Sequence, residues 1–150
     1  MSGTLVDTSV WVAAFFDENE FFLPAKAFIA SCSREKSALF CRATEQSWLR
    51  LVTTPSLHRL YKTPTITNAD AIGIHATWIA QPQIRCVDAE PEGTRELWLE
   101  LAAIPSASPK VWMDAYLAAF SIRTGLPLAA LDTDFRRFEA AGLQLQLLTA

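Results

Sequence analysis

Two acidic side chains follow apolar runs that are typical of strands. Asp7 comes after the run 4–6, and Asp132 comes after the run 128–131. Ligands collect beyond the carboxyl ends of parallel strands, so we expect these two carboxylates to meet at one edge of a sheet. Taken singly, Asp7 also fits a helix N-cap, and Asp132 also fits a turn. Only the pair suggests a site.

Asp114 lies in a predicted helix that is apolar nearly all the way round, from Val111 to Phe120. Such a helix is buried, and an ionised carboxylate there costs several kcal/mol unless it is paired, hydrogen-bonded or metal-bound. An ion pair with Lys110 on a wet helix face is worth only about 0.3–0.5 kcal/mol. We therefore favour a functional role for Asp114.

Glu45 is a fourth candidate, in a predicted helix that also carries Arg42 and Arg50. The position of Glu45 is explained equally well by an ordinary surface cluster of charges and by a role in a functional site. Neither His58 nor His75 stands in an acid-rich stretch, and no pair of cysteines has metal-type spacing, so no zinc site is predicted.

The elements that must position these residues alternate along the chain. Apolar runs predict strands at 4–6, 37–40, 84–87, 128–131 and 143–148, and helical patterns cover 10–16, 24–33, 42–52, 68–80, 91–103 and 110–124. This alternation is typical of a parallel sheet of four to five strands with helices on both faces. The expected fold class is α/β, built as a three-layer α/β/α domain.

Composition sets the limits on domain count and cellular compartment. The chain has 150 residues, of which 51% are hydrophobic, and it shows no repeat or linker, so one domain over 1–150 is expected. No apolar run approaches the roughly 18 residues of a membrane span, and no basic region precedes the first apolar stretch. Cys32, Cys41 and Cys86 are read as free thiols in a reducing cytosol, which predicts a cytoplasmic protein. The net charge of −3 does not itself predict a nucleic-acid binder.

In combination, these stretches resemble the PIN-domain ribonucleases, and among them the VapC-type toxins of toxin–antitoxin pairs. The matching residues are Leu5–Trp11, Cys41–Glu45, Trp48–Leu51, Asp114–Ala119 and Leu131–Phe135, in the family's order and at its usual spacing. The resemblance implies a Mg²⁺-dependent endoribonuclease, with Asp7, Glu45, Asp114 and Asp132 as its catalytic acids. It also implies accessory roles for Ser9, as a partner of a metal ligand, and for Asp134.

Mg²⁺, or Mn²⁺ in its place, prefers oxygen ligands and usually takes one or two protein carboxylates. We expect Asp7 and Asp114 to bind it directly, and Asp132 and Glu45 to act partly through water. RNA phosphates need basic contacts around the rim. The candidates are Arg42, Lys110, Arg123 and Arg136, with Arg50 and Arg137 beside them, although a solvated surface charge explains each one alone equally well.

Protein partners are the last expectation. The aromatic residues Trp11, Phe15, Phe16, Phe21 and Phe22 are either core or, where exposed, a docking surface for an antitoxin peptide or a second copy. Two alternative functions stay open at this point. One is a PIN-like binding module that has lost activity. The other is a haloacid-dehalogenase-like phosphatase, whose second aspartate is replaced here by Ser9.

Overall fold

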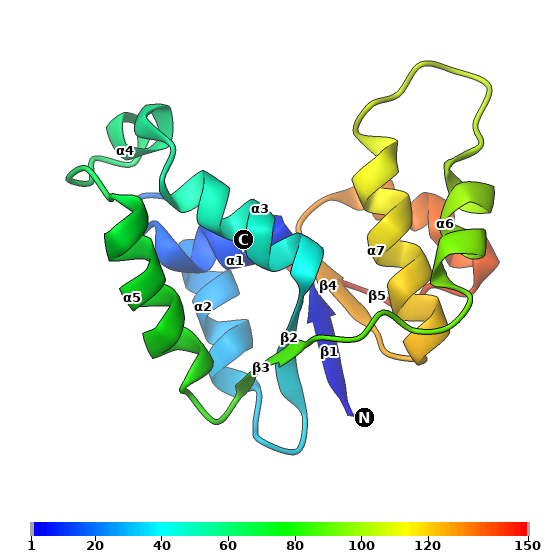
Figure 1. Ribbon diagram of the computed structural model, residues 1–150, viewed down its shortest axis with the longest axis horizontal. Coiled ribbons are helices and arrows are strands. Elements are labelled where there is room, and N and C mark those ends of the chain that lie inside the picture. The colour runs from blue at the N-terminus through cyan, green and yellow to red at the C-terminus, as the bar shows by residue number, and fades with distance from the viewer. Residues whose placement is uncertain (1, 150) are drawn as a thin grey trace.

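Five short parallel strands form the centre of the structure, a computed structural model that describes residues 2–149 (Figure 1). They lie in the order β3-β2-β1-β4-β5, so that β1 has a parallel neighbour on either side. The strands are β1 (Gly3–Val6), β2 (Ser37–Cys41), β3 (Ile84–Val87), β4 (Leu128–Ala130) and β5 (Leu145–Leu147). All five coincide with predicted strands, and the α/β class is confirmed.

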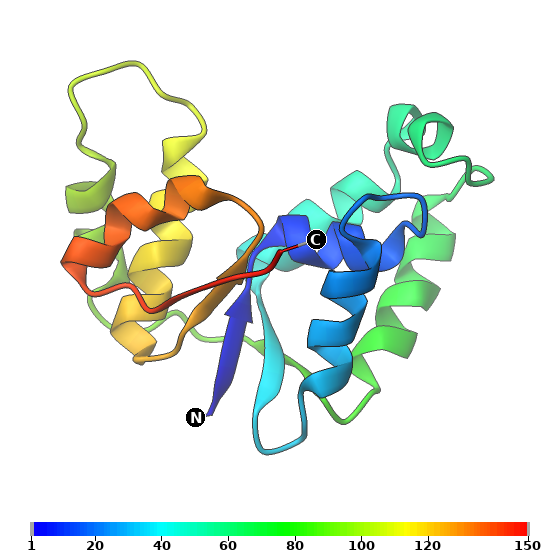
Figure 2. The ribbon, with the colours of Figure 1, turned by 180° about the vertical axis from the view of Figure 1, so that it is seen from behind.

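Alternate strand residues point to opposite faces of the sheet, and each face has its own core. Leu5 and Leu39 belong to one core, whereas Val6 and Phe40 belong to the other. The first core is covered by α6 (Thr94–Ala102), α7 (Val111–Thr124) and the 3₁₀ helix η1 (Thr133–Ala141). The second is covered by α1 (Thr8–Phe15), α2 (Phe22–Ser31), α3 (Arg42–Val52) and α5 (Asn68–Ile79). Figure 2 shows the sheet between these two groups, which is the predicted three-layer arrangement.

The aromatic residues near the N-terminus divide between core and surface. Trp11 and Phe16 are fully buried, and the Trp11 ring stacks on Phe40 with ring centroids 3.7 Å apart. The buried Trp48 indole donates a hydrogen bond to the Trp11 carbonyl over 3.2 Å, which fixes α3 against α1. Phe15, Phe21 and Phe22 remain half-buried. The prediction that these aromatic residues lie in the core is therefore confirmed for Trp11 and Phe16 only.

Three details differ from the sequence-based prediction. The short helix α4 (Pro55–Leu60) was not expected. Pro55 stands at its first position, where the missing backbone N–H is harmless. The 3₁₀ helix η1 was also not expected. Helix α6 begins at Thr94 rather than at 91, because Gly93 adopts a left-handed conformation with φ 82°. Within residues 2–149, none of the helices is long and apolar enough to cross a membrane.

Gly3 gives a test of how closely β1 and β2 are paired. It has φ +146°, and a Cβ added to it would lie 2.5 Å from the carbonyl oxygen of Ser37, its partner in the register. Gly3→Ala should therefore lower the free energy of unfolding by more than about 1 kcal/mol, measured by urea denaturation. Gly73→Ala, in α5 with open space around the added Cβ, is the control and should be neutral or stabilising. Equal effects of the two changes would contradict the strand pairing.

Candidate metal and catalytic centre

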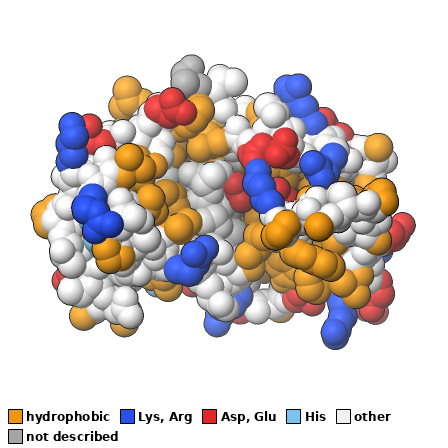
Figure 3. All heavy atoms as spheres, turned by 90° about the horizontal axis from the view of Figure 1, so that it is seen from above, with side chains coloured by type: hydrophobic (Ala, Val, Ile, Leu, Met, Phe, Trp, Pro, Cys, Tyr) orange, Lys and Arg blue, Asp and Glu red, His pale blue; other side chains and the backbone are white. Residues whose placement is uncertain are grey.

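Asp7, Asp114 and Asp132 come together at the edge of the sheet where the strands end. Asp7 directly follows β1, Asp132 stands two residues after β4, and Asp114 lies in the first turn of α7. Because β1 and β4 are parallel neighbours, the first two acids leave the sheet side by side. Figure 3 looks onto this edge and shows acidic and basic side chains gathered near its centre. Asp7 and Asp114 are buried.

Asp7 has the capping role that its position allows, and it also faces the other acids. Its carboxylate caps α1 by accepting a hydrogen bond from the backbone N–H of Ser9 over 3.4 Å, and it accepts another from the Ser9 hydroxyl. Burial raises the pKa of Asp7, and these Ser9 hydrogen bonds only partly offset that effect. The negative charge of Asp132 raises it further. Ser9 thus orients the Asp7 carboxylate.

Lys110 is the cation of this centre. Its ammonium group binds the Asp132 carboxylate directly and lies 3.3 Å from Asp134 and 3.9 Å from Asp114. Asp132 also caps η1 by accepting a hydrogen bond from the Asp134 backbone N–H over 2.8 Å. Lys110 is the main cause of the lowered pKa of Asp132, which in turn raises the pKa of Lys110. Lys110, which we expected to contact RNA, therefore forms ion pairs with three carboxylates of this centre.

Asp114 is the most perturbed of the acids. Burial is the largest cause that raises its pKa, to about 6, and Lys110 partly opposes the increase. The negative charges of Asp7, Asp132 and Asp134 add to it. The distant Lys110 contact is thus too weak to return the pKa of Asp114 to its ordinary value. A group with this pKa is close to half-protonated at weakly acidic pH.

The donor set fits a hard divalent cation. It consists of carboxylate oxygens alone, and the Lys110 ammonium already stands among them as a cation. The carboxylate oxygens of the three aspartates do not all lie within 4.8 Å of one another. Within residues 2–149, only the ligand atoms of Glu45, His75 and Cys86 reach that spacing. A looser arrangement suits Mg²⁺, which keeps several waters and takes one or two carboxylates directly.

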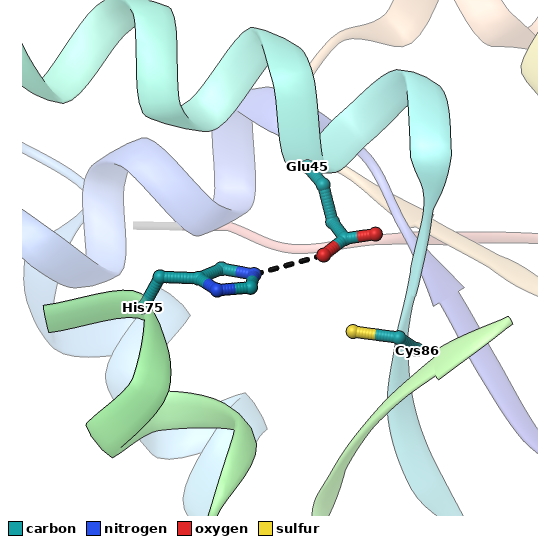
Figure 4. A group of neighbouring side chains, drawn as sticks. All are labelled: Glu45, His75 and Cys86. Atoms are coloured by element: carbon teal, nitrogen blue, oxygen red, sulfur yellow. Dashed lines mark hydrogen bonds and ion pairs between the residues drawn. The ribbon is translucent and has the colours of Figure 1, made fainter. Parts of the chain in front are cut away.

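Glu45 does not join the three aspartates. Its carboxylate lies 2.8 Å from His75 Nε2 and 3.3 Å from Arg42 Nε. The first turn of α3 directs this side chain toward α5 and β3, away from the β1–β4 side of the sheet, as Figure 4 shows. We expected Glu45 to converge with Asp7, Asp114 and Asp132. The sequence could not have shown this direction, because it depends on how α3 is rotated when it packs.

The predicted basic residues are spread over the molecule. Arg42 is exposed and bridges Glu45 and Asp88, and with Arg50 it lines a hollow of about 460 Å³ between α3 and α7 that also includes Met113, the neighbour of Asp114. Arg136 is exposed on η1. Arg123 lies near the other end of α7 and donates to the Gly93 carbonyl. It is therefore the least suited of the predicted RNA contacts.

Trp112 is a residue of this region that we did not single out in the sequence. It is 54% exposed, two residues before Asp114, and its ring packs edge-on against Trp98, whose indole donates to the Trp112 carbonyl over 2.8 Å. An indole held in this way can stack on a nucleic-acid base. In the sequence it looked like one more apolar residue of a buried helix.

This chain is similar in sequence to known proteins. The profile of the PIN domain family matches residues 4–141. Ribonuclease VapC41 of Mycobacterium tuberculosis is 36% identical over 144 residues, which cover 96% of this chain and 97% of that protein.

Two solved structures share the fold. One is VapC20 of Mycobacterium tuberculosis, described as a sarcin–ricin loop cleaving toxin, with a TM-score of 0.63 and 21% identity over 94% of this chain and 96% of that chain. The other is VapBC2 from Rickettsia felis bound to a DNA fragment from their promoter, with a TM-score of 0.60 and 12% identity over 97% of this chain and 98% of that chain. At these identities the likeness concerns the fold alone.

The raised pKa of Asp114 predicts how stability depends on pH. Between its ordinary value of 3.8 and about 6, the folded protein binds this proton more tightly than the unfolded chain does, so the Asp114 contribution to stability falls as pH rises through that interval. In EDTA at pH 7.5, Asp114→Asn should therefore be more stable than wild type by about 1–3 kcal/mol. The difference should vanish near pH 4.

Urea denaturation across this pH range measures the effect. Glu100→Gln, on the exposed face of α6, is the matched control and should follow wild type at every pH. If Asp114 were instead half of a structural ion pair, Asp114→Asn would lose about 3–5 kcal/mol at neutral pH, and the assignment would be overturned.

Proposed function

The chain belongs to the PIN-domain family, and from that premise we propose that it is a Mg²⁺-dependent endoribonuclease, the toxin of a VapBC-type toxin–antitoxin pair. The observation that carries the proposal is the meeting of Asp7, Asp114 and Asp132 at the carboxyl edge of the sheet, in a chain 36% identical to a ribonuclease over nearly its whole length. The same premise argues against a haloacid-dehalogenase-like phosphatase.

The three aspartates would hold Mg²⁺, which when bound supplies Lewis-acid chemistry at a phosphodiester and neutralises developing charge. Asp7 is preoriented for this by Ser9, and Asp132 by the N–H of Asp134. Asp114 supplies a carboxyl group that loses its proton readily near neutral pH. We do not assign Glu45 to this centre, because its carboxylate faces His75 instead.

RNA would approach along the hollow between α3 and α7. Arg42 and Arg50 line this hollow and would bind phosphates, which a centre rich in carboxylates cannot attract by itself. Trp112 would stack on a base beside Asp114, and Arg136 on η1 would contact the backbone from the other side. These contacts explain how an acidic chain could bind an anionic substrate.

An antitoxin peptide would dock in a different groove, on the face of the sheet that α1, α2 and α5 cover. A groove of about 580 Å³ runs between the α1–α2 region and the end of α5, with Phe15, Phe22, Ile29 and Trp78 on its walls and Lys26 beside them. An apolar groove of this kind suits the apolar face of a helix. The three free cysteines fit the reducing cytoplasm, where we place both the toxin and its partner.

The RNA assay tests the enzyme. With labelled RNA and Mg²⁺, wild type should cleave and EDTA should stop it. Asp7→Asn and Asp114→Asn should each lower the rate at least about a hundredfold, because each removes part of several kcal/mol of charge stabilisation. Glu100→Gln should cleave as wild type does. Cleavage that persists in both aspartate variants would contradict the assigned centre. A wild type without Mg²⁺-dependent cleavage would instead indicate an inactive binding module.

Two neighbouring residues of α2, one inside the groove and one outside it, allow a test of antitoxin docking. Phe22 lines the groove, whereas Leu23 beside it is 75% exposed and does not. Phe22→Asp should weaken the complex with a co-produced antitoxin at least about tenfold, since it replaces apolar contact area in the groove by a carboxylate that is costly to desolvate. Leu23→Asp should bind as wild type does. Calorimetric titration measures both, and an unchanged affinity for Phe22→Asp would remove the peptide from this groove. Self-association of the free toxin that Phe22→Asp abolishes would assign the groove to a second copy.

A further inference from the structure

Glu45, His75 and Cys86 form a cluster of their own, on elements other than those that carry Asp7, Asp114 and Asp132. One ligand atom from each lies within 4.8 Å of the other two. The three residues come from α3, α5 and β3, and Figure 4 shows their side chains pointing toward one another. The sequence alone did not predict them as a group, because they are far apart along the chain.

The geometry points to a second metal site, and we propose that Glu45, His75 and Cys86 bind a thiophilic divalent ion such as Zn²⁺. A carboxylate oxygen, an imidazole nitrogen and a thiolate sulfur are the three ligand types that Zn²⁺ takes in proteins. Tetrahedral coordination with bonds of about 2.0–2.3 Å separates such atoms by about 3.3–3.6 Å. Side-chain adjustments of about 1 Å bring the cluster to that spacing, and a water completes the shell.

The state of Glu45 supports a cation at this place. Its Oε1 atom is fully buried and accepts no hydrogen bond among the described residues, and the Arg42 guanidinium forms an ion pair with it at 3.3 Å. A buried carboxylate oxygen without a donor costs free energy. The His75 ring packs near Phe40 and Trp48, with ring centroids 6.1 Å away in each case, and its Nε2 atom lies 2.8 Å from the Glu45 carboxylate.

A nucleophilic cysteine is the rival interpretation of these three residues, and the electrostatics oppose it. Burial, followed by the Glu45 carboxylate, raises the pKa of the Cys86 thiol to about 12. A reactive cysteine needs the opposite shift. A bound divalent ion, by contrast, offsets the negative charge of Glu45 and holds a thiolate directly.

Such an ion would join three elements at the outer edge of the sheet. Strand β3 is an edge strand, paired only with β2 among the described strands, and α5 leads into it. One ion bound by residues of α3, α5 and β3 would fix this edge in place. The site is independent of the proposed nuclease centre, since it shares no residue with Asp7, Asp114 and Asp132.

Co²⁺ provides a direct test, because a cobalt–thiolate bond gives an ultraviolet charge-transfer band. Co²⁺ is titrated into the reduced full-length protein with excess Mg²⁺ present, and Zn²⁺ is then added. Wild type should develop a saturable band that Zn²⁺ abolishes. Cys86→Ser should lose the band, whereas Cys32→Ser, which alters a similarly half-buried thiol outside the cluster, should retain it. No saturable band in wild type, or an equal band in Cys86→Ser, would overturn the proposal.

Thermal denaturation with Zn²⁺ separates this site from the nuclease centre. Zn²⁺ should raise the Tm of wild type, because a ligand that binds the folded state stabilises it. His75→Gln and Glu45→Gln should lose most of that increase, and Asp114→Asn should keep it. An increase lost in Asp114→Asn but kept in His75→Gln would show that Zn²⁺ binds at the aspartates instead, and would refute the second site. This measurement does not depend on RNA cleavage, so the second metal site and the proposed nuclease function can each be refuted without the other.

Discussion

Parallel pairing of β1 with β4 is the constraint on which the acidic centre depends. Residues near the two ends of the chain, Asp7 and Asp132, become neighbours only because these strands run side by side and end at the same edge. The pairing is available because β1 lies in the middle of the sheet, flanked by β2 and β4. Helix α7 then packs on the core that Leu5 and Leu128 share, which carries Asp114 to the same edge.

The charge balance at this edge follows from that crowding. Burial and the neighbouring carboxylates raise the pKa values of Asp7 and Asp114, while Lys110 lowers that of Asp132. The caps at Ser9 and at the Asp134 N–H orient two of the acids through local backbone geometry. Capping and site roles are therefore compatible here, since one carboxylate has enough lone pairs for both.

Much of this could be predicted because it depends on local pattern. Apolar runs predicted all five strands, and the strand ends predicted where Asp7 and Asp132 would lie. The apolar surroundings of Asp114 predicted a costly buried carboxylate. By contrast, the direction of Glu45 depends on the rotation of α3, and its contacts with His75 and Cys86 depend on tertiary packing alone. Helix α4 and η1 were missed because Pro55 and Asp132, which stand at their beginnings, are also typical of turns.

The position of Lys110 changes what it means for the acidic centre to take up a metal. Lys110 already supplies one positive charge beside Asp114, Asp132 and Asp134, so loading of the proposed Mg²⁺ would be an exchange of cations. The free energy gained from a divalent ion is reduced by the cost of moving the ammonium group away. A site of this kind would bind the proposed ion less tightly than the same carboxylates would without the lysine. Before any ion binds, Lys110 offsets part of the negative charge at this edge, while Asp114 still keeps a raised pKa.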